Sequence, residues 1–271
     1  MTNREEGPKK LPELSVFFPA YNEAGNIERA VRQALAVLPT VAEKYEVLVI
    51  DDGSRDGTPE IVEKLSRAYI AVRVVSQPNK GYGGAIKRGF KEASFQWIFF
   101  TDADLQFDIA EIKKFIPHTE DYDLVIGYRM NRAEGWFRHG IALMLKVWNR
   151  VFLGFPLWVR DIDCAFKLLN KRVLGYASPL ASDGAMVSTE LLLKTLESGF
   201  RIKQMGVSHY PRRLGTSSGS SPKVILNAVK DTFMLRRQFR KESLLGRYGK
   251  ILANDLRDPW LGLGYFIRSL R

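Results

Sequence analysis

The chain has very few residues of the kinds that build disulfides and zinc sites. Among 271 residues there is one cysteine, Cys164, and there are three histidines. A single cysteine cannot close an internal disulfide and has no second thiolate for a zinc cluster, so a cysteine-rich metal site is excluded and redox chemistry is not expected. We therefore expect a chain that works in a reducing, cytoplasmic setting.

Long apolar runs are also missing. The first ten residues, MTNREEGPKK, are polar and mixed in charge, whereas a signal peptide requires an apolar core. Residues 141–159, the longest candidate for a membrane span, are interrupted by Lys146, Asn149 and Arg150. A spanning helix needs about 20 mostly apolar residues. We expect a protein that is soluble or lies on the cytoplasmic face of a membrane.

Charge is unevenly distributed along the chain. The net charge is +11, and residues 201–271 hold 15 basic against 4 acidic side chains, while the first 200 residues balance at 26 of each. A basic tail can meet nucleic acid, anionic lipid or a phosphorylated substrate, and charge alone does not choose between them. With 45% hydrophobic residues the chain can bury a full core.

Apolar runs alternate with helical periodicity in the first half of the chain. The segments LSVFFPAYNE, YEVLVIDDGS, AVRVVSQPNK, FQWIFFTDAD and DYDLVIGYR predict five strands. Helices are expected over residues 26–38, from Thr58-Pro59 onwards and over 85–93, the last after a glycine-rich loop at 79–84. This alternation predicts an α/β fold with a mostly parallel central sheet covered by helices on both faces.

Polar residues follow each of the first four predicted strands. They are Pro19 to Glu23, Asp51 to Ser54, Asn79 to Gly84, and Asp102 to Asp104. Ligands of such sheets bind beyond the carboxyl ends of the strands. We expect the four groups to meet at one edge of the sheet.

Asp102 and Asp104 flank a small residue directly after an apolar strand. Two carboxylates, completed by water and phosphate oxygens, suit Mg²⁺ or Mn²⁺. A lone D-x-D can also be a solvated turn, but its place among three other polar strand ends favours the metal site. Asp108 is predicted to cap a helix that starts near Ile109.

Two other strand ends have residues that could hold a nucleotide. Asp52 can accept the imino N–H of a nucleobase, while Ser54 or Asp56 can cap the following helix. The loop NKGYGGA matches neither a Walker loop nor a dinucleotide fingerprint. It is either a flexible turn or a loop whose backbone and Lys80 approach a diphosphate.

The motifs FPAYNE, DDGSRDGT, NKGYGGAIKRGF and TDADLQ, in this order, resemble those of the inverting glycosyltransferases of family 2, which have the nucleotide-sugar-binding GT-A fold. Within that family GYR, RDIDCAFKLLNK, STELLLKTLESGFRI and HYPRRLGTSS are similar to polyprenyl-phosphate (dolichol-phosphate) mannosyl- and glucosyltransferases. The resemblance covers roughly residues 14–218. The chain departs from the commoner pattern at Cys164-Ala165, where Ser-Gly is frequent, so the details of its sugar pocket are open.

The resemblance implies a donor nucleotide sugar, Mg²⁺ or Mn²⁺, and a lipid-linked phosphate acceptor. The predicted donor-binding residues are Pro19, Ala20, Tyr21, Glu23, Asp51, Asp52, Lys80, Gly83, Asp102, Ala103, Asp104 and Gln106. The predicted metal-binding residues are Asp102, Asp104 and Gln106. The predicted acceptor-phosphate residues are Arg129, Arg138, Arg212 and Ser217, and the predicted catalytic residues are Asp104, Arg129, Arg212 and Glu190.

The acceptor decides whether a general base is needed. A lipid monophosphate has a second pKa of about 6, so it is largely dianionic at neutral pH and needs cations to approach the donor diphosphate. Arginines suit this because they bind phosphate bidentately. A hydroxyl acceptor would need a base, which Glu190 could supply if it is not merely an exposed helix residue. His209 is expected to be a packed strand-end residue.

The last part of the chain is expected to be a basic amphipathic helix. We divide the chain into a polar tail at 1–12, a catalytic domain at 13–221 and a basic segment at 222–271. The segment rich in tryptophan at residues 136–159 is either interfacial or a core helix. The basic segment can bind a membrane surface, a membrane subunit or a second copy of the chain.

Two other classes of function are less well supported by the sequence. No motif for RNA or DNA binding stands out, so nucleic acid is not expected as a partner. A nucleotidyltransferase would share the sheet and the metal but would release pyrophosphate. Within the transferase class, mannose is the first guess for the sugar and glucose the second, and a hydroxyl acceptor is the alternative to the lipid phosphate.

Overall fold

The structure, a computed structural model, describes residues 9–130, 147–148, 150, 152–156, 158–212, 214 and 222–238. Its centre is a seven-stranded sheet in the order β3-β2-β1-β4-β6-β5-β7. The strands are β1 (Leu11–Ala20), β2 (Ala42–Asp51), β3 (Val72–Ser76), β4 (Trp97–Thr101), β5 (Leu124–Met130), β6 (Phe166–Asn170) and β7 (Ile202–Ser208).

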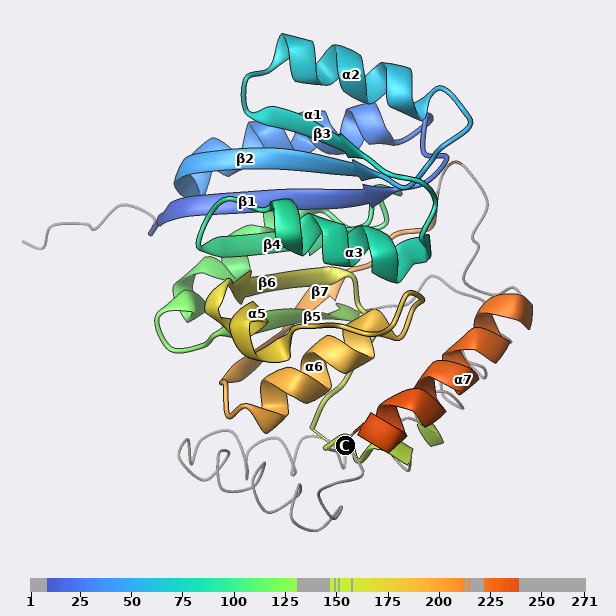
Figure 1. The fold of residues 1–271 in the computed structure, drawn as a ribbon. Coiled ribbons are helices and arrows are strands. Elements are labelled where there is room, and N and C mark those ends of the chain that lie inside the picture. Colours follow the sequence, from blue (N-terminus) through green and yellow to red (C-terminus); the bar gives the residue numbers. More distant parts are fainter. Residues whose placement is uncertain are drawn as a thin grey trace, which may run out of the picture.

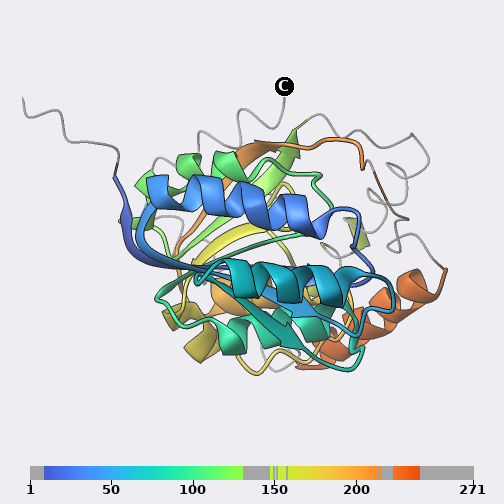
Figure 2. The same ribbon diagram turned by 90° about the horizontal axis from the view of Figure 1, so that it is seen from above.

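The helices cover both faces of this sheet (Figures 1 and 2). They are α1 (Ile27–Val37), α2 (Thr58–Ala68), α3 (Gly81–Glu92), α5 (Arg172–Ala177), α6 (Val187–Glu197) and α7 (Pro222–Gln238), with 3₁₀ turns η1 (Leu38–Thr40), η2 (Ile109–Lys114) and η3 (Ile116–Thr119). One buried cluster lies between the sheet and α1, α2 and η2, and a second lies beneath α3, α5 and α6. The predicted GT-A-like α/β architecture is confirmed.

Most strand pairs are parallel, as expected, but β6 is not. It pairs antiparallel with both β4 and β5, while β1/β2, β1/β4, β2/β3 and β5/β7 are parallel. The sequence analysis predicted neither β6 nor β7. The antiparallel strand β6 joins the half of the sheet that contains β1 to β4 to the half that contains β5 and β7.

The prediction of a glycine-rich loop at 79–84 is wrong from Gly81 onwards, because α3 begins at Gly81 and not at Ala85. Close packing explains the glycines of this helix. A Cβ on Gly89 would lie 2.5 Å from the ring of Phe17 on β1, whose ring stacks on Phe100 of β4 at a centroid distance of 5.2 Å. The helix therefore sits tightly on the sheet.

The predicted cap at Asp108 is confirmed, whereas the N-cap of α2 is Gly57, which makes no side-chain cap hydrogen bond. The Asp108 side chain accepts a hydrogen bond from Ala110 N at 2.9 Å and caps η2, as expected. The Asp56 side chain accepts from Thr58 N at 3.0 Å at the start of α2. Ser54 has another role, because its hydroxyl accepts from Asn22 N at 2.9 Å.

The predicted helix in the basic segment is confirmed as far as Gln238. Leu235 of α7 is fully buried, and Ala228 and Met234 pack against the second core cluster, so this helix packs against the body of the fold. The strand β1 starts at Leu11, two residues before the predicted domain start. In the described part of the chain, no helix is both long enough and apolar enough to cross a bilayer.

Candidate active site

The ends of the first strands meet as predicted. Asp52 N donates to Ala20 O at 2.9 Å, which ties the ends of β2 and β1 together, and Gln77 N donates to Asp51 O at 2.9 Å across to β3. Pro19 and Ala20 are buried in β1, while Tyr21 directly after it is exposed. Because β1, β2, β3 and β4 run parallel to one another, all four predicted polar groups lie at one edge of the sheet.

Asp52 is held in place by its own neighbours. Its Oδ1 accepts hydrogen bonds from Gln77 Nε2 at 2.7 Å and from Lys80 N at 2.9 Å. Asp51 has a structural bond, since its Oδ1 accepts from Ser54 N at 3.1 Å and so closes the turn. The two donors fix the orientation of the Asp52 carboxylate beside Lys80 at the start of α3.

Asp102 and Asp104 follow β4 directly. Asp104 is 7% exposed, and its Oδ1 accepts from Gln106 N at 3.1 Å, while Ala103 between the two acids is buried. Burial and the neighbouring Asp104 carboxylate raise the pKa of Asp102 to about 7, although Tyr82 favours its ionised form. Burial also raises the pKa of Asp104, against the opposing effects of Gln106 N–H and Arg212.

This pair fits a divalent cation. The Asp104 carboxylate raises the pKa of Asp102, and Arg212 compensates only part of the negative charge of the pair. Mg²⁺ uses few protein carboxylates and takes the rest of its ligands from water and phosphate. The described residues contain no cluster of three or more acidic, histidine or cysteine side chains that could form a complete metal cage. Gln106 lies beside the pair, with its Nε2 donating to Tyr210 O at 3.1 Å.

Arg212 reaches the same place from beyond β7. Its Nη2 donates to Glu23 Oε1 at 2.6 Å, and its Nη1 lies 3.6 Å from Asp104 Oδ2. The structure therefore brings the predicted donor residue Glu23, the predicted metal ligand Asp104 and the predicted acceptor arginine into one cluster.

Arg129 is paired with a residue that sequence reasoning did not single out. Its Nε and Nη2 donate to the two oxygens of Asp161 at 2.8 and 2.9 Å, and Arg129 N donates at 3.2 Å. Burial disfavours the charged guanidinium, but the bonds to Asp161 outweigh this effect and raise the pKa of Arg129. Asp161 thus fixes the orientation of Arg129 at the end of β5.

Lys167 is a second residue that sequence reasoning missed. It is fully buried in β6, and its Nζ donates to Cys164 O and to Ser188 Oγ, the latter at 3.3 Å. Burial lowers the pKa of Lys167, while Cys164 and the nearby carboxylates, including Asp102, counteract this effect. The signal was present as a lone lysine inside the apolar segment FKLLN.

The segment 181–183 packs against the start of α3. Gly83 N donates to Asp183 O at 2.8 Å, and a Cβ on Gly83 would lie 2.6 Å from Ser182 O. Gly83 thus allows two backbones to approach closely, and its N–H is already used by the protein. Burial, followed by Asp102, raises the pKa of the neighbouring Tyr82.

Glu190 on α6 holds the segment 181–183 through hydrogen bonds to its backbone. It is fully buried on α6, where its carboxylate accepts hydrogen bonds from Ala181 N at 2.9 Å and Ser182 N at 2.8 Å. Lys194 Nζ lies 2.8 Å from Glu190 Oε1. Glu190 is therefore not an exposed helix residue, and its oxygens bind the backbone and a lysine.

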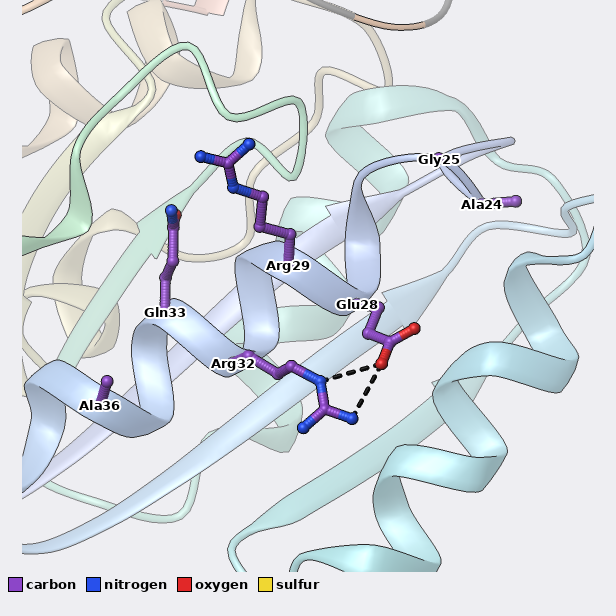
Figure 3. Close-up of a pocket in the computed structure, with 7 residues that line it drawn as sticks. All are labelled: Ala24, Gly25, Glu28, Arg29, Arg32, Gln33 and Ala36. Atoms are coloured by element: carbon purple, nitrogen blue, oxygen red, sulfur yellow. Dashed lines mark hydrogen bonds and ion pairs between the residues drawn. The ribbon is translucent and has the colours of Figure 1, made fainter.

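Two predicted acceptor-phosphate residues, Arg138 and Ser217, are outside the described residues, as are residues 136–146 of the tryptophan-rich segment. His209 is buried with its ring centroid 5.2 Å from that of Phe107, as expected of a packed strand-end residue. A surface hollow of about 510 Å³ runs along α1, and none of the predicted donor or acceptor residues lines it (Figure 3).

Comparison with known proteins agrees with this geometry. The family model described as "Glycosyl transferase family 2" matches residues 15–174. Glycosyltransferase AglD of Haloferax volcanii is 30% identical over 212 residues, which are 74% of this chain and 33% of AglD, so the chain spans about a third of that relative. Undecaprenyl-phosphate 4-deoxy-4-formamido-L-arabinose transferase of Sodalis glossinidius is 31% identical, covering 88% of this chain and 73% of the relative.

Solved structures share the fold. Glucosyl-3-phosphoglycerate synthase of Mycobacterium tuberculosis, solved with Mn²⁺, UDP and glucosyl-3-phosphoglycerate, superposes with a TM-score of 0.62 at 20% identity, covering 83% of this chain and 80% of the synthase. At that identity the likeness concerns the fold alone. The family match over more than half of the chain, on the strands that carry the acidic pair, shows that this chain belongs to glycosyl transferase family 2 and is a glycosyltransferase.

Proposed function

We propose that this chain transfers a hexose, with mannose the first choice and glucose the second, from a nucleoside diphosphate sugar to a polyprenyl phosphate, with inversion at the anomeric carbon. The observation that carries the proposal is the meeting of an acidic pair and an arginine at one sheet edge, where Arg212 Nη1 lies 3.6 Å from Asp104 Oδ2. The likeness to the undecaprenyl-phosphate transferase supports a lipid-linked acceptor.

The donor would bind along the ends of β1, β2 and β4. Asp52, held by Gln77 and Lys80 N, would accept the base N–H, with Pro19, Ala20 and Tyr21 beside it. The Lys80 side chain at the start of α3 is placed to neutralise a phosphate. Asp51 and Gly83 would contribute by shaping the backbone, because both already bond to the protein.

A divalent cation would bind at Asp102 and Asp104, with Gln106 nearby, and would stabilise the charge of the leaving diphosphate as a Lewis acid. The solved Mn²⁺ complexes of the mycobacterial synthase support a metal of this kind. The choice between Mg²⁺ and Mn²⁺ is part of the experiment below.

The acceptor phosphate would be bound by Arg129 and Arg212, together with Arg138 and Ser217. Arg129 is oriented by Asp161 and Arg212 by Glu23, so both guanidinium groups are pre-organised. A phosphate that is largely dianionic at neutral pH attacks without a general base, and the arginines reduce the repulsion between it and the donor. The buried Glu190 would then be a supporting residue.

The alternative with a hydroxyl acceptor requires Glu190 as the base. Its carboxylate would have to leave Ala181 N, Ser182 N and Lys194 before it could take a proton. This arrangement favours the phosphate acceptor.

We also propose peripheral attachment to a membrane surface through α7 and residues 147–148 and 152–153. Val147 and Phe233 are about half exposed, and Phe233 stands edge-on to Trp148 at 6.1 Å. Arg236 and Arg237 lie beyond them on the same helix. Aromatic and basic side chains together suit a lipid interface. A membrane subunit or a second copy of the chain would be the other occupants of this surface.

The test is transfer of radiolabel from a panel of nucleotide sugars into the organic phase, with a short polyprenyl phosphate and either Mg²⁺ or Mn²⁺. We expect one donor to be strongly preferred, and NMR of the product to show the inverted anomeric configuration. Asp104→Asn should lose about 100-fold or more, because several kcal/mol of charge stabilisation depend on that carboxylate. The exposed Asp121→Asn is the matched control. Transfer only to hydroxyl acceptors would overturn the proposal.

A further inference from the structure

A short segment after β7 crosses the candidate site. We call residues 209–212 and 214 the strap. His209 forms a β-bridge with Phe107, and Tyr210 exchanges two hydrogen bonds with Gln106, from Tyr210 N to Gln106 O at 2.8 Å and from Gln106 Nε2 to Tyr210 O at 3.1 Å. The strap is thereby fixed to the loop that holds Asp104.

The strap is also anchored on the loop between β1 and α1. Leu214 O accepts from Arg212 Nε at 2.8 Å and from Asn26 Nδ2 at 3.3 Å, and the Leu214 side chain packs on Gly25. Asn26 Nδ2 donates in addition to Glu23 Oε2 at 2.8 Å. Both oxygens of Glu23 thus face protein donors, one from Asn26 and one from Arg212.

Arg212 is the only strap residue that connects both loops by charge within the described residues. Its Nη2 is 2.6 Å from Glu23 Oε1 and its Nη1 is 3.6 Å from Asp104 Oδ2, with the side chain 19% exposed. A guanidinium in this position compensates part of the charge that a metal would compensate. Two cations at one carboxylate repel each other strongly in a site that is only partly solvated.

We propose that Arg212 is the resident counter-cation of Asp104 in the donor-free chain and competes with the divalent metal for this carboxylate. When a nucleoside diphosphate enters with the metal, its phosphate charges compensate both cations, and Arg212 turns from a competitor into a ligand shared by the donor diphosphate and the acceptor phosphate. Metal binding is therefore weak alone and strong with the nucleotide. Glu23 is the positioning residue that keeps Arg212 in reach of both. This inference rests on the proposed function.

The test measures Mn²⁺ binding, with and without UDP or GDP, from the electron paramagnetic resonance signal of the Mn²⁺ that remains free. Arg212→Met should bind Mn²⁺ alone about tenfold more tightly, because one nearby positive charge is gone. The same variant should bind the nucleoside diphosphate at saturating Mn²⁺ about tenfold more weakly, because a phosphate ligand is gone. Arg67→Met is the matched control, because it removes an arginine from an exposed ion pair with Glu63 on α2.

A second variant separates charge from mere support of the strap. Glu23→Gln keeps Arg212 but removes its second anion, so Arg212 pairs with Asp104 alone and Mn²⁺ alone should bind more weakly. Opposite shifts for the two variants support the proposal, whereas weaker Mn²⁺ binding in both would mean a structural role and would overturn it. If the unaltered chain binds no Mn²⁺ even with UDP or GDP, the proposed metal-dependent function itself is refuted.

Discussion

Replacing Glu190 by glutamine distinguishes a general base from a carboxylate that supports the fold. The side chain is fully buried, and its oxygens accept from Ala181 N and Ser182 N and face Lys194. In Glu190→Gln one oxygen becomes an NH₂ group that cannot accept, and Lys194 loses its partner. Breaking a buried ion pair costs about 3–5 kcal/mol, and we expect roughly 2–4 because Lys194 keeps some contact with water and donates to Pro179 O.

Thermal unfolding measures this cost directly. For a chain of this size each kcal/mol shifts Tm by about 2–4 °C, so Glu190→Gln should melt roughly 5–15 °C lower. Well below that Tm, kcat should fall less than about tenfold and its pH profile should keep its shape, because no proton moves through this residue in transfer to a phosphate.

The opposite result would refute the assignment. A general base contributes about 100-fold to 10,000-fold to the rate, so a variant with unchanged Tm, such a loss in kcat and a vanished acidic limb of the pH profile would make Glu190 the base and the acceptor a hydroxyl. Glu60→Gln, on the exposed face of α2, is the matched control for both measurements.

Three further predictions concern stability and the membrane surface. Burial disfavours the charged form of Glu46, but hydrogen bonds from Ser15, Ser94 and Arg73 outweigh this effect and lower the pKa of Glu46. The ionised carboxylate therefore stabilises the fold above its unfolded pKa of about 4.3, and this stability is lost as the pH falls through the lower pKa of the folded state. Glu46→Gln should cost about 1–3 kcal/mol at pH 7 and make the free energy of unfolding depend less on pH on the acid side. Gly89→Ala should cost about 1–3 kcal/mol because its Cβ meets the Phe17 ring, whereas Gly175→Ala, with open space, should be neutral or slightly stabilising in urea titrations. Phe233→Asp should weaken sedimentation with anionic vesicles about tenfold or more, while Ile70→Asp, at an apolar side chain that is even more exposed, should leave it unchanged; equal loss in both would exclude α7 as the docking surface.

Local sequence patterns were sufficient to predict the donor half of the sheet. The run ending at Phe100 predicts a buried strand, and the acids that follow it must lie at the carboxyl edge, because the strand period and the parallel arrangement leave no other place. Asp108 as a cap is likewise a local property of a few residues. These elements could be predicted because the chemistry that defines each of them lies within a few neighbouring positions.

Other parts of the site depend on contacts between distant positions. Lys167 is a charged residue at a fully buried position of β6. Its ammonium group donates to the Cys164 carbonyl and to the Ser188 hydroxyl of α6. The Arg129–Asp161 pair joins residues 32 positions apart and the Arg212–Glu23 pair residues 189 apart. No periodicity predicts such pairings, so Arg129, Arg212 and Glu23 could be predicted from the sequence, whereas their pairings, Asp161 and Lys167 could not.

The site is assembled from two halves of the sheet, and contacts between these halves determine its geometry. Gly83 on α3 bonds to the segment that Glu190 supports, and Gln106 bonds to Tyr210. Arg212 closes the same junction by charge. The donor edge by itself could hold a nucleotide, but the proposed acceptor phosphate, bound at Arg129 and Arg212, would approach it from the other half. A substitution that loosens this junction should therefore impair transfer to the acceptor more than binding of the donor nucleotide.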